Sequence, residues 1–491
     1  MGAFDKETGC IAYGHPVAYG DRVAIVTTCD VVNYADWIFG GKGYNWSVKT
    51  PSHTKKTVNL EITGGKKLHG VVTTNTAKNS AVGLLCASLL NRGTTTLRDM
   101  PKIEEVHRII EVLQSIGVAV AWDKNDLAIT PPKKLALAKM DVATAMRTRS
   151  AIMLMGPLLH LFPKFRLPQA GGCQLGSRAI KPHFFALEPL GVSIKTLPKT
   201  YEISHGTFRK NRRIVLYESG DTVTENLLMA AAKVTGETTI VFASANYQVQ
   251  DLCHFLTRFG VSIQGIGTTT LIVRGVKDIE MDISFRPGED PIESMLFLSI
   301  AAATNSEITI KRCPMDFLEL ELLKMEKMGF RYKVLREYVS KNGHTRLADL
   351  KTLNSPRLTA LQEKIHPSVY PGLNIDNLPF FVPVALRAEG QTLIHDWVYE
   401  NRAIYFLELK KLGADIILAD SHRVYVKGPA RLTAAEIICP PALRPAAIIM
   451  IAMLMAEGTS LLRNVYSINR GYEDLAKRLR RLGADVKMFN S

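Results

Sequence analysis

The sequence predicts an α/β protein that repeats one structural unit six times. The first observation is a recurring phrase in which an amphipathic helix ends at a glycine and a short apolar strand follows. The glycines are Gly117, Gly191, Gly260, Gly329, Gly413 and Gly483. Their spacings of 74, 69, 69, 84 and 70 residues are too long for a solenoid repeat and long enough for a small α/β subdomain. Since 491 residues predict more than one domain, we expect two lobes of three units each.

Each unit is expected to contain a strand, a helix rich in Ala and Leu, a Thr-rich strand, a second helix and a closing strand. In the first unit the helices are predicted over 81–91 and 104–116, with a strand over 94–98 between them. Apolar residues of the second helix recur at helical spacing. Gly117 then stands where a left-handed C-terminal cap is expected, and Gly458 is expected to end a helix of the last unit. We assign these glycines a structural role only.

The repeat also defines the expected domain organisation. Residues 1–56 stand outside it as an N-terminal extension without an assigned role. One lobe is expected to combine residues 57–76 with 278–491, and the second lobe to span residues 77–277. A cleft between two lobes is a common place for a ligand site.

Composition narrows the class of partner. Lys and Arg exceed Asp and Glu by 61 to 46, which favours anionic partners. We attribute the excess to a dispersed basic surface or a cleft for an anionic small molecule, and we expect no nucleic acid. The seven cysteines are scattered without a CxxC pair, which is typical of a reducing compartment without a disulfide framework or structural zinc. With neither a secretory signal nor a membrane-length apolar run, a cytoplasmic protein without a membrane span is expected.

Cationic residues stand at the expected starts of several helices. Lys78, followed by Asn79, precedes the first helix, where free N–H groups and the helix dipole favour an anion. Arg149, Arg402 and Arg444 also precede expected helices. For each of them, a solvated helix end is the alternative interpretation.

Two further stretches carry groups suited to catalysis. Cys173 lies in a glycine-rich loop with Arg178 and His183 nearby, and a cysteine near cations can have a depressed pKa and act as a nucleophile or proton donor. Asp376 follows a turn at an expected helix start, where it is either a general base or a helix cap. No HExxH, phosphate-binding loop or complete dinucleotide fingerprint occurs, so neither a metal nor a cofactor is predicted.

Taken in order, these motifs resemble the UDP-N-acetylglucosamine 1-carboxyvinyltransferase family, which is related to the shikimate-pathway synthase. The resemblance runs from about residue 58 to residue 482. It rests on Ala77-Lys78-Asn79, Gly156-Pro157-Leu158, Gly171-Gly172-Cys173 with Gly176 and Arg178, Asp376, Glu400-Asn401-Arg402, Leu443-Arg444 and Arg470-Gly471-Tyr472-Glu473. It implies two inside-out α/β prisms, each of three βαβαββ-type units, with a double crossover.

The resemblance also implies a reaction: enolpyruvyl passes from phosphoenolpyruvate to the 3′-hydroxyl of UDP-N-acetylglucosamine, and phosphate is released, in the first committed step of peptidoglycan precursor synthesis. It implies three catalytic residues, Cys173, Asp376 and Lys78. Cys173 is the acid that protonates C3 and the target of fosfomycin, and Asp376 is the base. Phosphoenolpyruvate would be held by Lys78, Arg149, Arg178, Arg402 and Arg444. The nucleotide sugar would be held by Asn79, Arg149, His183, Asp376, Val398 and Glu400.

The chain departs from the family pattern at three places. Arg178 is followed by Ala179, and Lys181 replaces an Asp. Gly220-Asp221-Thr222-Val223 replaces Ser-Val-Gly-Ala, and Pro291 replaces the Arg of Asp-Arg-Ile-Glu. The first two lie where uridine and diphosphate are expected. The alternatives are therefore an enolpyruvyl transferase for another nucleotide or for shikimate 3-phosphate, and a nonenzymatic anion-binding protein. The oligomeric state is not predicted.

Overall fold

A computed structural model describes residues 17–19, 22–24, 58–169, 171 and 180–490. The chain forms two compact units, Met1–Lys55 and Lys56–Ser491. In the first unit, β1 (Val17–Tyr19) and β2 (Arg22–Ala24) pair antiparallel. The repeated architecture lies in the second unit, to which all that follows refers.

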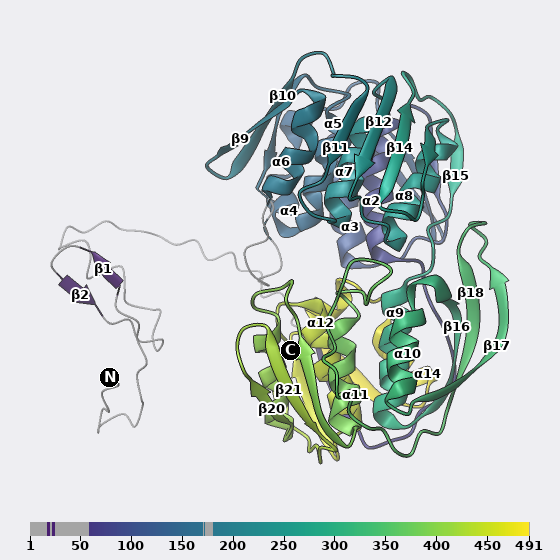
Figure 1. Ribbon diagram of the computed structural model, residues 1–491, viewed down its shortest axis with the longest axis vertical. Helices are drawn as coiled ribbons and strands as arrows, with labels where there is room; N and C mark the ends of the chain where they lie inside the picture. The colour runs from purple at the N-terminus through teal and green to yellow at the C-terminus, as the bar shows by residue number, and fades with distance from the viewer. Residues whose placement is uncertain (1–16, 20–21, 25–57, 170, 172–179, 491) are drawn as a thin grey trace. The chain divides into compact units, whose positions relative to one another are not determined.

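Two separate hydrophobic cores divide this unit into two lobes. The N-lobe is built around buried residues between Ala81 and Phe285. The C-lobe core takes residues 60–77 together with 292–486. Tyr247 packs into the C-lobe core although its helix belongs to the N-lobe. The chain therefore crosses between lobes twice, as Figure 1 shows.

Each lobe carries three sheets on its outside, with one sheet for each repeat. The N-lobe sheet orders are β15-β5-β7-β6, β8-β10-β9 and β11-β12-β14-β13. Their strands are β5 (Thr95–Leu97), β6 (Ala119–Asp123), β7 (Asp126–Thr130), β8 (Lys164–Pro168), β9 (Val192–Leu197), β10 (Thr200–His205), β11 (Arg212–Val215), β12 (Gly236–Val241), β13 (Ser262–Gln264), β14 (Thr270–Gly275) and β15 (Ile283–Phe285).

The C-lobe sheet orders are β17-β18-β16-β4, β19-β21-β20 and β22-β23-β3-β24. Their strands are β3 (Val58–Thr63), β4 (His69–Thr73), β16 (Glu307–Pro314), β17 (Arg331–Val339), β18 (Arg346–Leu353), β19 (Gly390–His395), β20 (Asp415–Leu418), β21 (Arg423–Gly428), β22 (Glu436–Ile438), β23 (Thr459–Arg463) and β24 (Asp485–Asn490). The four four-stranded sheets of the two lobes share one pattern, a parallel pair followed by two antiparallel pairings.

Helices that are apolar on every side fill the middle of each lobe. Every residue of α9 except its last is buried, and α12 is buried from its second to its twelfth residue. A helix without a polar face has to be surrounded by protein, which places these helices inside and the sheets outside. The inner helices are α2 (Lys78–Ala87), α5 (Met155–Leu158) and α7 (Asp221–Ala231) in the N-lobe, and α9 (Pro291–Thr304), α11 (Phe381–Arg387) and α12 (Leu443–Met455) in the C-lobe.

The second helix of each unit ends at the repeated glycine. All six glycines have positive φ, from 85° at Gly260 to 97° at Gly117, which confirms the left-handed caps. At the first of them, the amides of Gly117 and Val118 donate to carbonyls of the preceding turn. These helices are α3 (Glu104–Ser115), α6 (Lys181–Leu187) continued by the 3₁₀ turn η4 (Glu188–Leu190), α8 (Tyr247–Arg258), α10 (Glu319–Lys327), the 3₁₀ helix η7 (Ala403–Leu412) and α14 (Leu475–Arg481).

The predicted fold class, six units in two inside-out α/β lobes, is confirmed. The first predicted helix begins earlier than expected, at Lys78, and ends as a 3₁₀ turn, η1 (Ser88–Leu90). The lobe boundary after residue 277 stays a prediction, and β15 beyond it pairs with β5 of the N-lobe.

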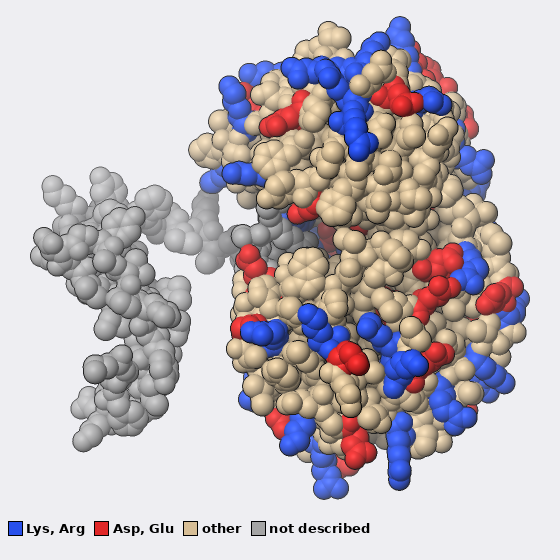
Figure 2. All heavy atoms as spheres, viewed as in Figure 1, with Lys and Arg blue, Asp and Glu red and all other residues tan. Residues whose placement is uncertain are grey.

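Charged side chains are scattered over the face of both lobes that Figure 2 shows. Figure 2 shows basic and acidic groups interspersed on the face in view, with basic ones gathered over the outer edge of the N-lobe, near β10 and β12. Within the described ranges, no helix has the length and apolar character needed to cross a membrane.

Candidate functional site

The predicted cations stand at the starts of helical segments. Lys78 is the first residue of α2, Arg149 opens the 3₁₀ helix η3 (Arg149–Leu154), Arg402 directly precedes η7, and Arg444 is the second residue of α12. These segments belong to both lobes, so the fold, and not the sequence spacing, decides which of these side chains meet. Cys173 and Arg178 lie outside the described residues.

Lys78 lies at the centre of a charged cluster shared by the two lobes. Burial lowers the pKa of Lys78 from its ordinary value of 10.5. Glu105 acts in the opposite direction, and Arg444 adds to the lowering, while Asp376 and Arg470 act more weakly. A buried lysine whose pKa is perturbed by specific charged neighbours is a candidate functional group.

An ion pair joins the lobes beside Lys78. Arg470 donates from Nη2 and Nε to Glu105 Oε2 over 2.8 Å and 3.2 Å. Thr148 donates to the other carboxylate oxygen over 2.6 Å. Burial alone would raise the pKa of Glu105, but Lys78 and Arg470 hold it below its ordinary value, so the carboxylate is ionised at neutral pH.

Asp376 lies between two arginines of the C-lobe. Its Oδ2 accepts a hydrogen bond from Arg444 Nη2 over 3.3 Å, and its Oδ1 lies 3.8 Å from Arg402 Nη1. Arg444 also donates to Tyr472 Oη over 2.7 Å, and its guanidinium lies 5.5 Å from the centre of the Tyr472 ring. These contacts fix the position of the Asp376 carboxylate beside the cations that surround Lys78.

Arg402 is fully buried and contacts the segment that carries Asp376. Its Nε donates to the equally buried Asp396 over 2.5 Å, and its Nη2 donates to the carbonyl oxygen of Ile375 over 2.8 Å. Its guanidinium covers the Tyr399 ring at 4.4 Å. Nη1 is buried without a hydrogen-bond acceptor among the described residues and points to Asp376. Arg402 therefore positions the carboxylate, as its full burial also indicates.

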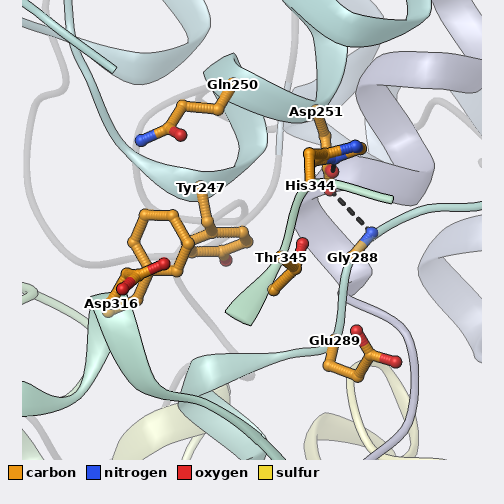
Figure 3. A pocket seen from close by; sticks show the side chains of 9 residues that line it. Tyr247, Gln250, Asp251, Gly288, Glu289, Asp316, His344 and Thr345 are labelled. Carbon is orange, nitrogen blue, oxygen red and sulfur yellow. Dashed lines mark hydrogen bonds and ion pairs between the residues drawn. The ribbon is translucent and has the colours of Figure 1, made fainter. Parts of the chain in front are cut away.

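Asn79 connects this cluster to a pocket between the lobes. Its Oδ1 accepts from Lys78 Nζ over 3.1 Å, and its Nδ2 donates to Tyr247 Oη over 3.0 Å. Figure 3 shows Tyr247 on one side of the pocket, facing Asp316, with His344 and Asp251 on another. The walls come from both lobes: Tyr247, Gln250, Asp251, Gly288, Glu289, Asp316, Phe317, His344 and Thr345. Within these walls, His344 Nε2 lies 3.0 Å from Asp251 Oδ1.

His183 and Arg149 lie together in the N-lobe. Asn226 donates to His183 Nδ1 over 2.9 Å and to the Ile152 carbonyl over 3.1 Å, while its Oδ1 accepts from the Gly156 amide. Nδ1 is therefore an acceptor, and the ring carries its proton on Nε2. Burial, with a smaller contribution from Arg149, lowers the pKa of His183 to about 4, so the imidazole is neutral at pH 7.

Val398 and Glu400 lie on the segment between β19 and η7, and both are exposed. The backbone amide of Tyr399, between them, donates to Asp396 over 3.4 Å. The same buried Asp396 thus anchors both Arg402 and the segment that carries these two residues.

The departures from the family pattern have different structural contexts. Asp221 accepts from Ser244 Oγ over 2.5 Å and from Asn246 Nδ2 over 3.1 Å, and burial raises its pKa. Lys181 is exposed at the first position of α6. Asp290 caps α9 by accepting from the amides of the second and third helix residues, and Pro291 occupies the first helical position, where proline is favoured.

Four residues of the site were not predicted as site residues. Arg470 and Tyr472 occur in one of the motifs that carry the resemblance, and this was their only sequence signal. Glu105 had no sequence signal, because its partner Arg470 lies 365 residues away along the chain. Asp396 follows a strand, and its sequence context does not distinguish it from other residues at strand ends.

The lowered pKa of Lys78 predicts a pH effect on substrate capture. The charged ammonium is lost as pH rises through the lowered pKa, so kcat/KM for an anionic substrate should fall on the alkaline side below pH 10.5. Lys78→Arg keeps its charge over this range and should lack that alkaline decline. The exposed Lys66→Arg is the matched control and should follow the wild type. An alkaline limb in Lys78→Arg identical to that of the wild type would contradict the assignment.

Comparisons with known proteins identify relatives of this chain. The model of the family described as EPSP synthase (3-phosphoshikimate 1-carboxyvinyltransferase) matches residues 62–479. A relative from Borreliella burgdorferi, named UDP-N-acetylglucosamine 1-carboxyvinyltransferase, is 31% identical over 432 residues, which cover 88% of this chain and 99% of the relative. A relative of the same name from Sulfurovum sp. is 32% identical over 441 residues, which cover 87% of this chain and 98% of the relative.

Solved structures support the fold. The enolpyruvyl transferase NikO from Streptomyces tendae superposes with a TM-score of 0.75 at 21% identity, covering 89% of this chain and 100% of that one. An EPSP synthase from Acinetobacter baumannii superposes with a TM-score of 0.67 at 18% identity, covering 88% of this chain and 100% of that one.

Proposed function

Because this chain belongs to the EPSP synthase family of enolpyruvyl transferases, we propose that it transfers enolpyruvyl from phosphoenolpyruvate to the 3′-hydroxyl of UDP-N-acetylglucosamine. The observation that carries the proposal is the cluster of Lys78, Arg444 and Asp376, which joins cations and a carboxylate where the lobes meet. The name that these relatives share supports the acceptor.

The cations of the cluster suit the donor. Phosphoenolpyruvate carries a phosphate and a carboxylate, so several fixed positive charges are needed to bind it and to stabilise charge that develops in the transition state. Lys78 and Arg444 supply these charges from opposite lobes, and Arg149 and Arg178 complete the set. Arg402 contributes from beneath Asp376.

The proposed chemistry assigns one proton transfer to each of two residues. Cys173 protonates C3 of phosphoenolpyruvate, and Asp376 accepts the proton of the sugar hydroxyl as its oxygen bonds to C2. The C2–O bond to phosphate then breaks, and C3 returns a proton to the Cys173 thiolate as the double bond forms again. Phosphate is the leaving group, so its release reports on the complete reaction.

The remaining predicted residues shape the acceptor site. Asn79 lies against Lys78, and neutral His183 can donate from Nε2. Val398 and Glu400 present exposed side chains from the segment that Asp396 anchors. We place the protein in the cytoplasm, at the first committed step of peptidoglycan precursor synthesis, where both small-molecule substrates occur and no cofactor is required.

A second acceptor is favoured by one observation. Lys181 reverses the charge of the Asp that the family has at this position, and Asp221 adds a negative charge. Both lie where the nucleotide is expected, which suits a nucleotide other than UDP-N-acetylglucosamine. The Cys173 loop disfavours shikimate 3-phosphate, because the shikimate enzyme works without that cysteine. A nonenzymatic anion-binding role does not require the carboxylate that the two arginines hold in place.

A phosphate-release assay tests the proposal. With phosphoenolpyruvate and UDP-N-acetylglucosamine, the wild type should release phosphate continuously, and Cys173→Ser should lose most of this activity. Fosfomycin should inactivate the wild type by alkylating Cys173. The variant Cys439→Ser, at a buried cysteine of the C-lobe, should stay sensitive. If phosphate is released only with another acceptor, UDP-N-acetylglucosamine is not the acceptor. If Cys173→Ser keeps full turnover, Cys173 is not the acid.

A further inference from the structure

The side chain of Tyr247 spans the junction of the two lobes. Tyr247 is the first residue of α8 in the N-lobe, but it is only 4% exposed and packs into the core of the C-lobe. Its ring centre lies 5.8 Å from that of Phe317, and the Phe317 ring centre lies 5.1 Å from that of Tyr370 in the same lobe. The hydroxyl of Tyr247 accepts a hydrogen bond from Asn79 Nδ2 over 3.0 Å. Both lobes therefore fix the position of this hydroxyl.

Packing explains the ring of Tyr247 but not its hydroxyl. A phenylalanine would fill the same space without burying a polar group, which costs free energy unless it is hydrogen-bonded. Burial raises the pKa of Tyr247 well above its ordinary value of 10.0, and the carboxylates of Asp290 and Asp376 raise it further. Arg444 acts in the opposite direction, and Asp221 adds a smaller increase. The phenol therefore stays neutral at physiological pH and can act as a hydrogen-bond partner.

The side-chain amide of Asn79 is held at both ends. Its Oδ1 accepts from Lys78 Nζ over 3.1 Å, and its Nδ2 donates to Tyr247 Oη. Another acceptor near Nδ2, Gln248 Oε1, lies 3.5 Å away, at the limit of hydrogen bonding. The two ends of an amide have nearly the same shape, so the partners decide which end faces which way. Tyr247 therefore keeps the oxygen of the amide, and not its nitrogen, turned to Lys78.

We propose that Tyr247 is a positioning residue, whose hydroxyl fixes the Asn79 amide so that the amide oxygen stabilises the charged ammonium of Lys78. This inference rests on the proposed function, in which Lys78 binds phosphoenolpyruvate. A hydrogen bond that favours the charged form of a lysine raises its pKa, so the amide opposes the lowering that burial causes. The other charged groups that act on Lys78 come from both lobes: Glu105, Arg444, Asp376 and Arg470.

Tyr247→Phe removes the hydroxyl and keeps the ring. The Asn79 amide can then turn, so Lys78 loses part of the stabilisation of its charge and its pKa falls further. Binding of phosphoenolpyruvate, measured by titration calorimetry across the alkaline range, should therefore weaken at a lower pH than in the wild type, by up to about one pH unit. At neutral pH, kcat/KM for UDP-N-acetylglucosamine should fall about 2- to 12-fold, the effect of about one neutral hydrogen bond.

A double variant tests whether Tyr247 acts through Asn79. Asn79→Ala removes the amide, so binding of phosphoenolpyruvate should again weaken at a lower pH, because Lys78 loses its hydrogen bond to the amide. Adding Tyr247→Phe to Asn79→Ala should give no further shift, since the hydroxyl has lost the group through which it acts. A hydroxyl that only stabilised the fold would leave the pH dependence of binding unchanged in both backgrounds.

Tyr338→Phe is the matched control, since its hydroxyl donates to Asp349 over 2.8 Å between β17 and β18 of the C-lobe. It should keep the pH dependence of the wild type. An unshifted pH dependence in Tyr247→Phe overturns the role of Tyr247, and so does an additional shift in the double variant. A wild type that does not bind phosphoenolpyruvate overturns this role and the proposed function together. If the shift occurs as expected but no enolpyruvyl reaches UDP-N-acetylglucosamine, the proposed function fails and the role of Tyr247 stands.

Discussion

Asp376→Asn should lower kcat by about 10²- to 10⁴-fold, the usual contribution of a positioned general base. The amide keeps the size of the side chain and can still accept a hydrogen bond from Arg444, but it cannot take the proton of the sugar hydroxyl. Since Arg402 and Arg444 fix the carboxylate from two sides, the substitution should leave the surrounding structure in place.

Steady-state kinetics with direct binding of the nucleotide sugar separates catalysis from binding in this variant. We expect the loss in kcat, with a Kd for UDP-N-acetylglucosamine that changes by less than about tenfold, the effect of about one neutral hydrogen bond. Asp420→Asn is the control, because Asp420 also pairs with an arginine of the C-lobe, Arg423, but lies exposed. A kcat in Asp376→Asn within tenfold of the wild type would refute the role of base.

Asp396→Ala should cost about 3–5 kcal/mol of unfolding free energy, the usual effect of removing one partner of a buried ion pair. Neither Arg402 nor Asp396 is exposed, so the substitution leaves a buried guanidinium. Among the described residues it would keep the Ile375 carbonyl as its one hydrogen-bond acceptor and the Asp376 carboxylate 3.8 Å from Nη1. Urea unfolding followed by circular dichroism measures the loss.

Two further variants make this stability test decisive. Asp420→Ala removes the carboxylate of the exposed pair with Arg423 and should leave the urea midpoint unchanged. The double variant Asp396→Leu with Arg402→Met removes both buried charges and should recover most of the lost stability. It should remain inactive, however, because Asp376 loses the arginine that positions it. If Asp396→Ala unfolds at the wild-type midpoint, the pair does not stabilise the fold.

Local sequence signals were sufficient to predict the scaffold. A left-handed residue at a helix end strongly favours glycine, so six such glycines at similar spacing predicted six helix ends correctly. Gly117 shows why: its φ of 97° lies in a region that is strained for other residues. Helix starts were harder to place, since α2 begins at Lys78 without a side-chain cap and no local residue type announces it.

The site could be predicted only in part, because its contacts join distant segments. Lys78, Asp376 and Arg444 were predicted, and the structure brings them into one cluster. Glu105 and Asp396 were missed because their roles depend on a partner that tertiary structure supplies. The predicted Cys173 and Arg178 lie outside the described residues, and their roles rest on the resemblance.

The sheet β22-β23-β3-β24 bears on how the protein assembles during synthesis. Its first strand to be made, β3, pairs with β23 and with β24, which ends at Asn490. The hydroxyls of Thr63 and Thr459 meet across 396 residues of chain. The N-lobe core, by contrast, comes from one continuous stretch between Ala81 and Phe285. During synthesis on the ribosome, the N-lobe can therefore fold while β3 is still unpaired. The sheet of the C-lobe that contains β3 is completed only after β24 has emerged.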